Sequence, residues 1–203
     1  MAVAVTRERS DSVALPPLLV LTDRTQCRRP LVETVAAAVE GGVRAVVLRE
    51  KDLPTKQRHV LAERLWRVLA PVGGVLIAAS RLVGPAQGVH LAAADPSTKA
   101  PVVGRSCHNA AEVDAVSDVD YVTVSPVFAT ASKPGYGPPL GLAGLRALCA
   151  RTPVKVYALG GVTRDNAASC LDAGAAGVAV MGAVMRAEDP AFVAAEILKE
   201  VSG

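Results

Sequence analysis

The sequence predicts an α/β protein that forms one (β/α)8 TIM barrel, and three observations lead to this prediction. From Leu18 onward, short apolar runs alternate with stretches in which apolar residues recur at helical spacing. Runs such as "AVVL" and "GVAVM" are apolar at nearly every position, which is typical of parallel strands buried on both faces. Eight such strand units can be counted, and eight units close naturally as a barrel.

The first half of the chain contains four of these units. Their strands are predicted at "LLVLTDR", "VRAVVLREKD", "GVLIAAS" and "GVHLAAAD". An apolar stripe from Val32 to Val39 predicts the first helix, and Pro54 begins a second helix that ends at Pro71 and Gly73. Only "RLVGPAQ" separates the third strand from the fourth. Because this segment is short and poor in helix formers, we predict an abbreviated third β-α connection.

The second half supplies the other four units. Their strands are predicted at "VVGRSCH", "DYVTVSPVF", "VKVYALGG" and "AGVAVMGAV", with helices at "NAAEVDAVSD", "LGLAGLRALCART" and "TRDNAASCLDAG". Asp189 and Pro190 provide the cap and first turn of a terminal helix. Residues 1–17 are interpreted as an N-terminal leader and residues 18–203 as the barrel. The alternative, an open doubly wound sheet, usually begins with a glycine fingerprint, which "LTDRTQC" lacks.

Composition argues against several classes of protein. No apolar stretch reaches the roughly 20 residues of a membrane-spanning helix. A net charge of +3 with 3% aromatic residues does not indicate nucleic-acid binding. The four cysteines have neither zinc-site spacing nor a disulfide pattern. We therefore expect a cytoplasmic protein without membrane or nucleic-acid partners, and helices rich in Ala and Val make a homodimer unsurprising.

Cations outnumber carboxylates at the strand ends, which form the working face of such barrels. Arg49 and Lys51 alternate across Glu50, so in an extended segment both side chains point the same way. Lys133 lies in a long segment after the sixth strand. Three convergent cations predict a phosphate or diphosphate site. The alternative is an ion-pair belt in which Glu50 and Asp95 neutralise Arg49 and Lys51.

Hydroxyl groups and glycines extend the predicted anion site. Thr130 and Ser132 lie in the same long segment as Lys133 and are candidates for holding an anionic ligand. The glycine tips of the last two strands, Gly160, Gly161 and Gly182, lie where barrels frequently bind phosphate. They could equally be plain turn residues.

The histidines are ambiguous in the sequence. His90 lies within a strand, which favours a packed histidine over a base. His108 ends "RSCH" just before a helix, where a helix cap or solvated loop residue competes with acid-base work. Cys107 alternates with its two neighbours, so we expect it to face the helices.

Seven segments, in order, resemble the thiamin phosphate synthase and TenI family. They are "LTDR", "LREKD", "GVHL" with its following Asp, Ser106 and His108 of "SCH", "SPVFATASK", "LGGV" and "GVAVMGAV", and they cover Leu18 to about Met185. The resemblance implies a (β/α)8 barrel of thiamin biosynthesis that binds small phosphorylated substrates. In the synthase, an aminopyrimidine diphosphate loses diphosphate and a thiazole phosphate captures the cation.

The resemblance also assigns roles to individual residues. It gives Arg49, Lys51 and Lys133 to the leaving diphosphate, and it gives Asp95 to Mg²⁺. The thiazole phosphate is expected on the amides of Gly161 and Gly182, beside Gly160, with Thr130 and Ser132 lining the thiazole. Ser106 matches a serine that contacts the pyrimidine.

Two departures from the family pattern favour alternatives. The third strand ends in "AASR" where the family has an Asn-Asp-Arg tip, and Val47 stands where it has glutamine. The half of the site that would bind diphosphate and metal therefore lacks residues that the family has there. This suggests the TenI reaction, a thiazole tautomerisation that needs an acid and a base but no metal. His108 is the nearest candidate for that work. A barrel that binds thiazole phosphate without turnover, as a regulator, is the second alternative. The resemblance keeps thiamin phosphate synthase as the first expectation.

Overall fold

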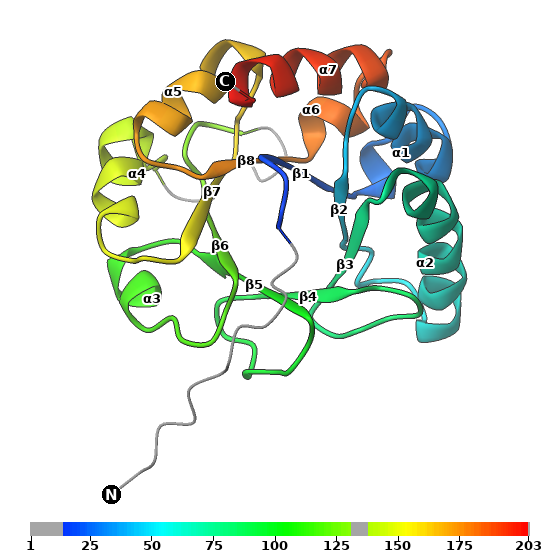
Figure 1. The fold of residues 1–203 in the computed structure, drawn as a ribbon, viewed down its shortest axis with the longest axis horizontal. Coiled ribbons are helices and arrows are strands. Elements are labelled where there is room, and N and C mark those ends of the chain that lie inside the picture. Colours follow the sequence, from blue (N-terminus) through cyan, green and yellow to red (C-terminus); the bar gives the residue numbers. More distant parts are fainter. Residues whose placement is uncertain (1–13, 131–137, 203) are drawn as a thin grey trace, which may run out of the picture.

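Eight parallel strands close into a ring in their order along the chain (Figure 1). The computed structural model describes residues 14–130 and 138–202. The strands are β1 (Leu18–Leu21), β2 (Ala45–Leu48), β3 (Val75–Ala79), β4 (Gly88–Leu91), β5 (Val102–Cys107), β6 (Tyr121–Val124), β7 (Lys155–Leu159) and β8 (Gly177–Val180). Pairing of β1 with β8, with Val20 opposite Val180, closes the barrel. The predicted (β/α)8 fold is confirmed.

Helices surround this ring on most of its circumference (Figure 1). They are α1 (Leu31–Glu40), α2 (Thr55–Leu69), α3 (Ala110–Asp114), α4 (Gly141–Cys149), α5 (Arg164–Asp172), α6 (Gly182–Met185) and α7 (Pro190–Val201), with 3-10 turns at Arg24–Gln26 (η1) and Ala70–Val72 (η2). Asp189 caps α7 by accepting a hydrogen bond from the Phe192 amide at 3.0 Å, as the sequence predicts.

Two connections carry no helix, one more than the sequence analysis recognised. The segment from β3 to β4 is abbreviated as predicted, and the segment from β4 to β5 also lacks a helix. Arg105 Nη1 holds this second segment by donating to the carbonyl oxygens of Ala92, Ala93 and Asp95 at 2.8–3.0 Å. Hydrogen bonds from one guanidinium therefore order a connection that contains no helix.

Alternation along the strands divides the apolar side chains into two sets. One set, which includes Leu19, Val47 and Ile77, fills the inside of the barrel. The larger set lies between the strands and the helices and includes Cys107, as its alternation predicts. The barrel is therefore a packed core with its polar positions at the carboxyl ends of the strands.

Two tyrosines fill the lower part of the barrel. Tyr121 and Tyr157 meet edge to face with ring centroids 5.6 Å apart, and both are almost fully buried. A Cβ atom at Gly104 would lie 2.1 Å from the Tyr121 ring, so the missing side chain at Gly104 makes room for Tyr121. Tyr157 Oη donates to the Pro16 carbonyl at 3.0 Å, which places the chain before β1 against the barrel floor.

The predicted leader falls largely on residues 1–13, which lie outside the described residues. The Val178 amide donates to the carbonyl of Pro17 at 2.8 Å, which fixes the chain just before β1. Within the described ranges, no helix is long and apolar enough to cross a membrane.

Candidate functional site

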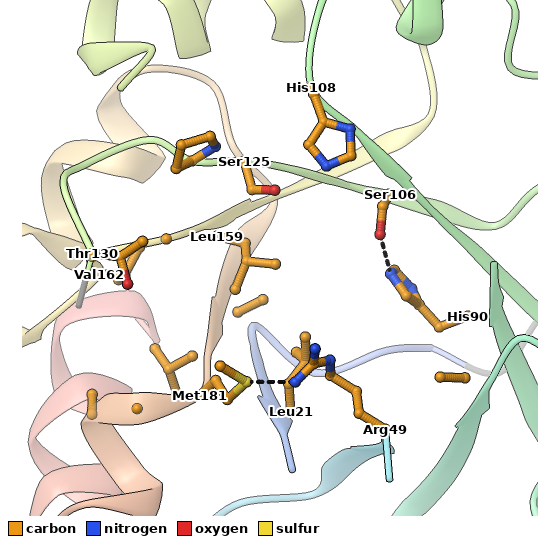
Figure 2. Close-up of a pocket in the computed structure, with 18 of the residues that line it drawn as sticks. Leu21, Arg49, His90, Ser106, His108, Ser125, Thr130, Leu159, Val162 and Met181 are labelled. Carbon is orange, nitrogen blue, oxygen red and sulfur yellow. Dashed lines mark hydrogen bonds between the residues drawn. The ribbon is translucent and has the colours of Figure 1, made fainter. Parts of the chain in front are cut away.

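A cavity of about 520 Å³ opens at the carboxyl ends of the strands (Figure 2). Eight of the eleven residues predicted to form a site line it: Arg49, Lys51, Ser106, His108, Thr130, Gly160, Gly161 and Gly182. They come from five different strand ends, β2, β5, β6, β7 and β8. No carboxylate lines this cavity among the described residues. The arrangement favours an anionic ligand.

The other three predicted residues are not in this lining. Ser132 and Lys133 lie outside the described residues. Asp95 borders a neighbouring hollow, which shares Ala93 and Ser106 with the main cavity.

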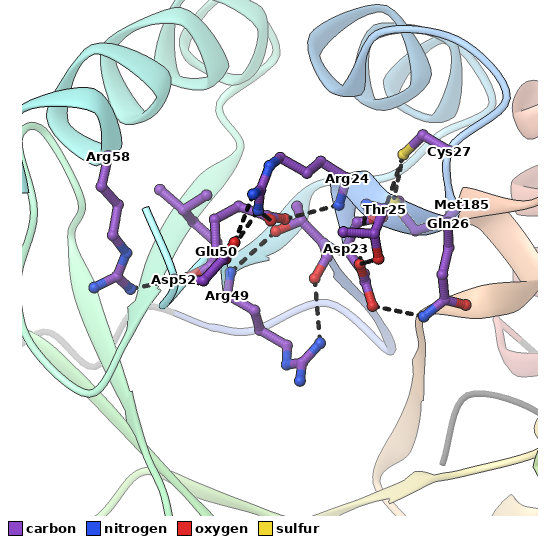
Figure 3. Close-up of polar contacts among 12 residues, drawn as sticks. Asp23, Arg24, Thr25, Gln26, Cys27, Arg49, Glu50, Asp52, Arg58 and Met185 are labelled. Atoms are coloured by element: carbon purple, nitrogen blue, oxygen red, sulfur yellow. Dashed lines mark hydrogen bonds and ion pairs between the residues drawn. The ribbon is translucent and has the colours of Figure 1, made fainter. Parts of the chain in front are cut away.

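Arg49 and Lys51 line the cavity, whereas Glu50 between them points away from it. This is the alternation of side chains expected in an extended segment. Glu50 is 4% exposed and accepts from Arg24, at 3.1 Å from the backbone amide and at 2.9 Å from Nη1 (Figure 3). Arg24 also contacts Asp52 at 2.5 Å, so one cation engages both neighbouring carboxylates. Within the part of the chain that the structure describes, Arg49 and Lys51 form no ion pair. The ion-pair belt considered above is therefore not formed by Glu50.

The Arg49 side chain reaches across the mouth toward β8. Its backbone amide donates to Thr22 Oγ1 at 3.0 Å, and its Nη1 lies 2.8 Å from the sulfur of Met181 (Figure 2). Thioether sulfur is a weak acceptor, whereas a phosphate oxygen forms a strong, charge-assisted hydrogen bond with guanidinium. An anion in the cavity would thus be a better partner for Arg49 than Met181 is.

The glycines after β7 let two loops approach closely. Gly161 has a φ of +66°, and a Cβ atom there would lie 2.4 Å from the carbonyl oxygen of Ala129. The amides of Gly160 and Gly161 donate to no other described residue. They can therefore donate to a ligand, as the sequence analysis predicts for a phosphate.

The sixth strand ends earlier than predicted, at Val124 rather than at Phe128. The next residues leave the β6 ladder and attach to β7: the Val127 amide donates to the Leu159 carbonyl at 2.9 Å, and Phe128 donates to Gly160 at 3.0 Å. These bonds bring Thr130 to the cavity.

His90 is a buried, neutral histidine, as its position within a strand favours. Its Nδ1 lies 3.0 Å from Tyr121 Oη. Its Nε2 lies 3.0 Å from Ser106 Oγ (Figure 2). Burial, helped by the charges of Lys51 and Arg49, lowers its pKa to about 3. A neutral imidazole between two hydroxyl groups holds Ser106 in a fixed orientation at the cavity wall.

His108 is paired with Glu112 at the edge of the cavity. The Glu112 Oε2 atom lies 2.9 Å from His108 Nδ1 and accepts from the His108 amide at 2.8 Å. Burial acts to raise the pKa of Glu112, but the hydrogen bonds from His108 outweigh it and hold that pKa below its usual value. His108 is thus both part of the α3 cap and a residue that lines the cavity, so the two interpretations drawn from the sequence are compatible.

Asp95 borders the hollow beside the cavity. Its Oδ2 atom accepts a hydrogen bond from the Ala92 amide at 2.9 Å. This bond lowers the pKa of Asp95 despite partial burial, and a hydrogen bond from Ser80 and the nearby charge of Lys51 lower it further. No group of three or more metal-ligating side chains occurs within the described ranges. Mg²⁺ commonly uses one or two carboxylates together with substrate phosphates. The donor set therefore fits Mg²⁺ only as a site shared with a phosphorylated ligand.

The sequence analysis missed three polar residues of the cavity, Ser125, Thr163 and Arg186. Ser125 follows Tyr121 and Thr123 at every second position, so strand alternation could have identified it. Arg186 follows α6 and has no such signal, because its direction depends on how the chain turns after β8.

Comparison with known proteins gives consistent results. The sequence model of a family described as thiamine monophosphate synthase matches residues 18–184. A thiamine-phosphate synthase of Albidiferax ferrireducens is 42% identical over 180 residues, covering 82% of each chain. One from Moorella thermoacetica is 35% identical, covering 90% of this chain and 93% of its own. The solved thiamine phosphate pyrophosphorylase of Pyrococcus furiosus is 31% identical with a TM-score of 0.81, covering 92% of this chain and 96% of its own.

Proposed function

Since the chain belongs to the thiamine monophosphate synthase family, we propose that it is a thiamin phosphate synthase. This transferase joins an aminopyrimidine diphosphate to a thiazole phosphate and releases diphosphate. The observation that carries the proposal is the pair Arg49 and Lys51. Both line a cavity that has no carboxylate among its described lining residues, while Arg24 engages Glu50. Two phosphorylated substrates require such a surplus of positive charge.

The first step would separate charge, and the cations are placed to stabilise it. The bond between the pyrimidine methylene carbon and the diphosphate oxygen breaks, and its electron pair leaves with diphosphate. Arg49 and Lys51 would stabilise the negative charge that develops on the leaving group. Lys133, although outside the described residues, is a third cation for the same role.

The second step would join the two rings. The thiazole nitrogen donates its electron pair to the methylene cation and forms the new carbon-nitrogen bond. The Gly161 and Gly182 segments and Thr130 would hold the thiazole phosphate, with Gly160 and Ser132 beside them. Ser106, oriented by His90, would contact the pyrimidine. Positioning of the two substrates in one cavity is itself a large part of such catalysis.

Asp95 would hold Mg²⁺ together with phosphate oxygens of the substrate. The ion, when bound, supplies further positive charge to the diphosphate.

A tautomerase is the second candidate function, and His108 is the observation that favours it. The imidazole lines the cavity, and Glu112 fixes its orientation through Nδ1. A histidine held in this way can transfer a proton to or from a thiazole carbon or nitrogen without a metal.

One set of assays separates the candidates. The purified chain is incubated with thiazole phosphate and pyrimidine diphosphate, with and without Mg²⁺, and separately with the non-aromatic thiazole tautomer. Thiamin phosphate formed in the first mixture supports the synthase. Aromatisation of the tautomer alone supports the tautomerase, and thermal stabilisation without either product supports the binding-only alternative.

Location and assembly follow as further proposals. All four cysteines are free, in keeping with a reducing cytoplasm. Small phosphorylated compounds would be the partners, rather than nucleic acid or membrane. A homodimer stays a prediction, which light scattering on the purified chain tests.

A further inference from the structure

Arg186 is a third cation of the cavity, and its side chain folds back over the end of β8. A Cβ atom at Gly182 would lie 2.3–2.5 Å from the guanidinium atoms of Arg186. The guanidinium therefore occupies the space that a side chain at residue 182 would need. It lies at the β8 end of the cavity, whose lining also includes Gly161 and Thr130.

Two residues of the loop after β1 hold this guanidinium from outside the cavity. Arg186 Nη1 donates a hydrogen bond to Gln26 Oε1. Gln26 Nε2 in turn donates to Asp23 Oδ2 at 2.6 Å (Figure 3). Asp23 Oδ1 accepts from the amide and hydroxyl of Thr25 at 3.1 and 2.6 Å. Because the carboxylate can only accept, it turns the Gln26 amide nitrogen inward and presents the oxygen to Arg186.

This chain of hydrogen bonds links the ends of two strands that are neighbours in the closed barrel. Asp23 follows β1, and Arg186 follows β8. An exposed arginine normally loses side-chain entropy when it binds a ligand. A guanidinium already held by Gln26 has lost part of that freedom, so less remains to be lost on binding.

We propose that Arg186 is a substrate-binding residue for the phosphate group of thiazole phosphate, and that Gln26 and Asp23 position its guanidinium. The proposal deepens the proposed function and rests on it for the identity of the ligand. The proposal is based on the position of the Arg186 guanidinium, which Gln26 holds against Gly182. The amides of Gly160 and Gly161 are available to a ligand in the same cavity. Guanidinium pairs well with phosphate because its N–H groups match two oxygens at once. Arg49 and Lys51, which follow β2, remain for the diphosphate.

The test compares binding of thiazole phosphate with binding of the thiazole alcohol, which lacks the phosphate, by isothermal titration calorimetry. We expect Arg186→Gln to weaken thiazole phosphate about tenfold, as the loss of one charge-assisted contact predicts, and to leave the alcohol unchanged. Arg186→Lys should keep part of the affinity. Gln26→Ala should weaken thiazole phosphate less, and should add nothing in the Arg186→Gln background. Arg67→Gln, an exposed arginine in the last turn of α2, is the matched control.

Several results would overturn the proposal. They are unchanged thiazole phosphate affinity in Arg186→Gln, an equal loss for phosphate and alcohol, and no binding of thiazole phosphate by the unmodified chain. Because the readout is binding, it is separate from turnover. If the unmodified chain binds thiazole phosphate through Arg186 but forms no thiamin phosphate, the synthase proposal fails while the role of Arg186 stands.

Discussion

The buried His90 should make the stability of the barrel depend on pH. Its pKa is about 3 in the folded protein and about 6.5 in the unfolded chain. Between these values the unfolded chain binds a proton that the folded protein does not bind. The His90 contribution is therefore fully present above pH 6.5 and is lost as the pH falls toward 3.

The size of the effect follows from the two pKa values. Each pKa unit corresponds to about 1.4 kcal/mol, so lowering the pH from 7 to 5 should decrease the free energy of unfolding by about 2 kcal/mol through His90 alone. Urea unfolding at the two pH values measures this decrease. Carboxylates also titrate in this range, so the informative quantity is the difference between the protein and a variant.

His90→Gln is the variant to compare, because its neutral amide can bond the hydroxyls of Ser106 and Tyr121 without titrating. Between pH 7 and pH 5, we expect the free energy of unfolding of His90→Gln to fall by about 2 kcal/mol less than that of the unmodified chain. His59→Gln, on the exposed face of α2, should behave like the unmodified chain. Identical pH dependence in His90→Gln and the unmodified chain would refute the inference that His90 stays neutral.

Three further predictions concern the site and the barrel that supports it. Arg49→Gln should decrease kcat/KM for thiamin phosphate formation about 100-fold, because one donor to the developing charge is lost; steady-state kinetics would contradict this if the value were unchanged. Asp95→Asn should raise the Mg²⁺ concentration for half-maximal activity at least about tenfold, and a magnesium titration showing no shift would remove Asp95 from the metal site. Gly104→Ala should destabilise the fold by about 1–3 kcal/mol through the clash with the Tyr121 ring, and equal urea midpoints for the two proteins would argue against it.

Much of the fold could be predicted because its signals are local. The alternation of apolar runs and helical stripes indicates each unit without knowledge of its neighbours. Strand ends are less predictable, since polar tips such as "REKD" continue the pattern of the run after the ladder has ended at Leu48. The missing helix between β4 and β5 was not recognised as a second irregularity. Its replacement by Arg105 hydrogen bonds depends on three-dimensional contacts.

The candidate site also has features that local sequence predicts and features that depend on contacts between distant parts of the chain. Strand alternation is enough to place Arg49 and Lys51 on one side of the chain. Which cation engages Glu50 is not a local property, because Arg24 lies 26 residues earlier in a segment without periodicity. Arg186 is likewise brought to the cavity by a turn and by Gln26, 160 residues away in the chain.

The tyrosine-filled floor has a consequence for the order of events in the barrel. With Tyr121 and Tyr157 blocking the lower end, substrates and products must share the rim as their route. A ring seated against Ser106 and His90 would then lie beneath one bound at Gly161. The substrate that carries the deeper ring would have to bind first, and product-inhibition patterns would reveal such an order of binding.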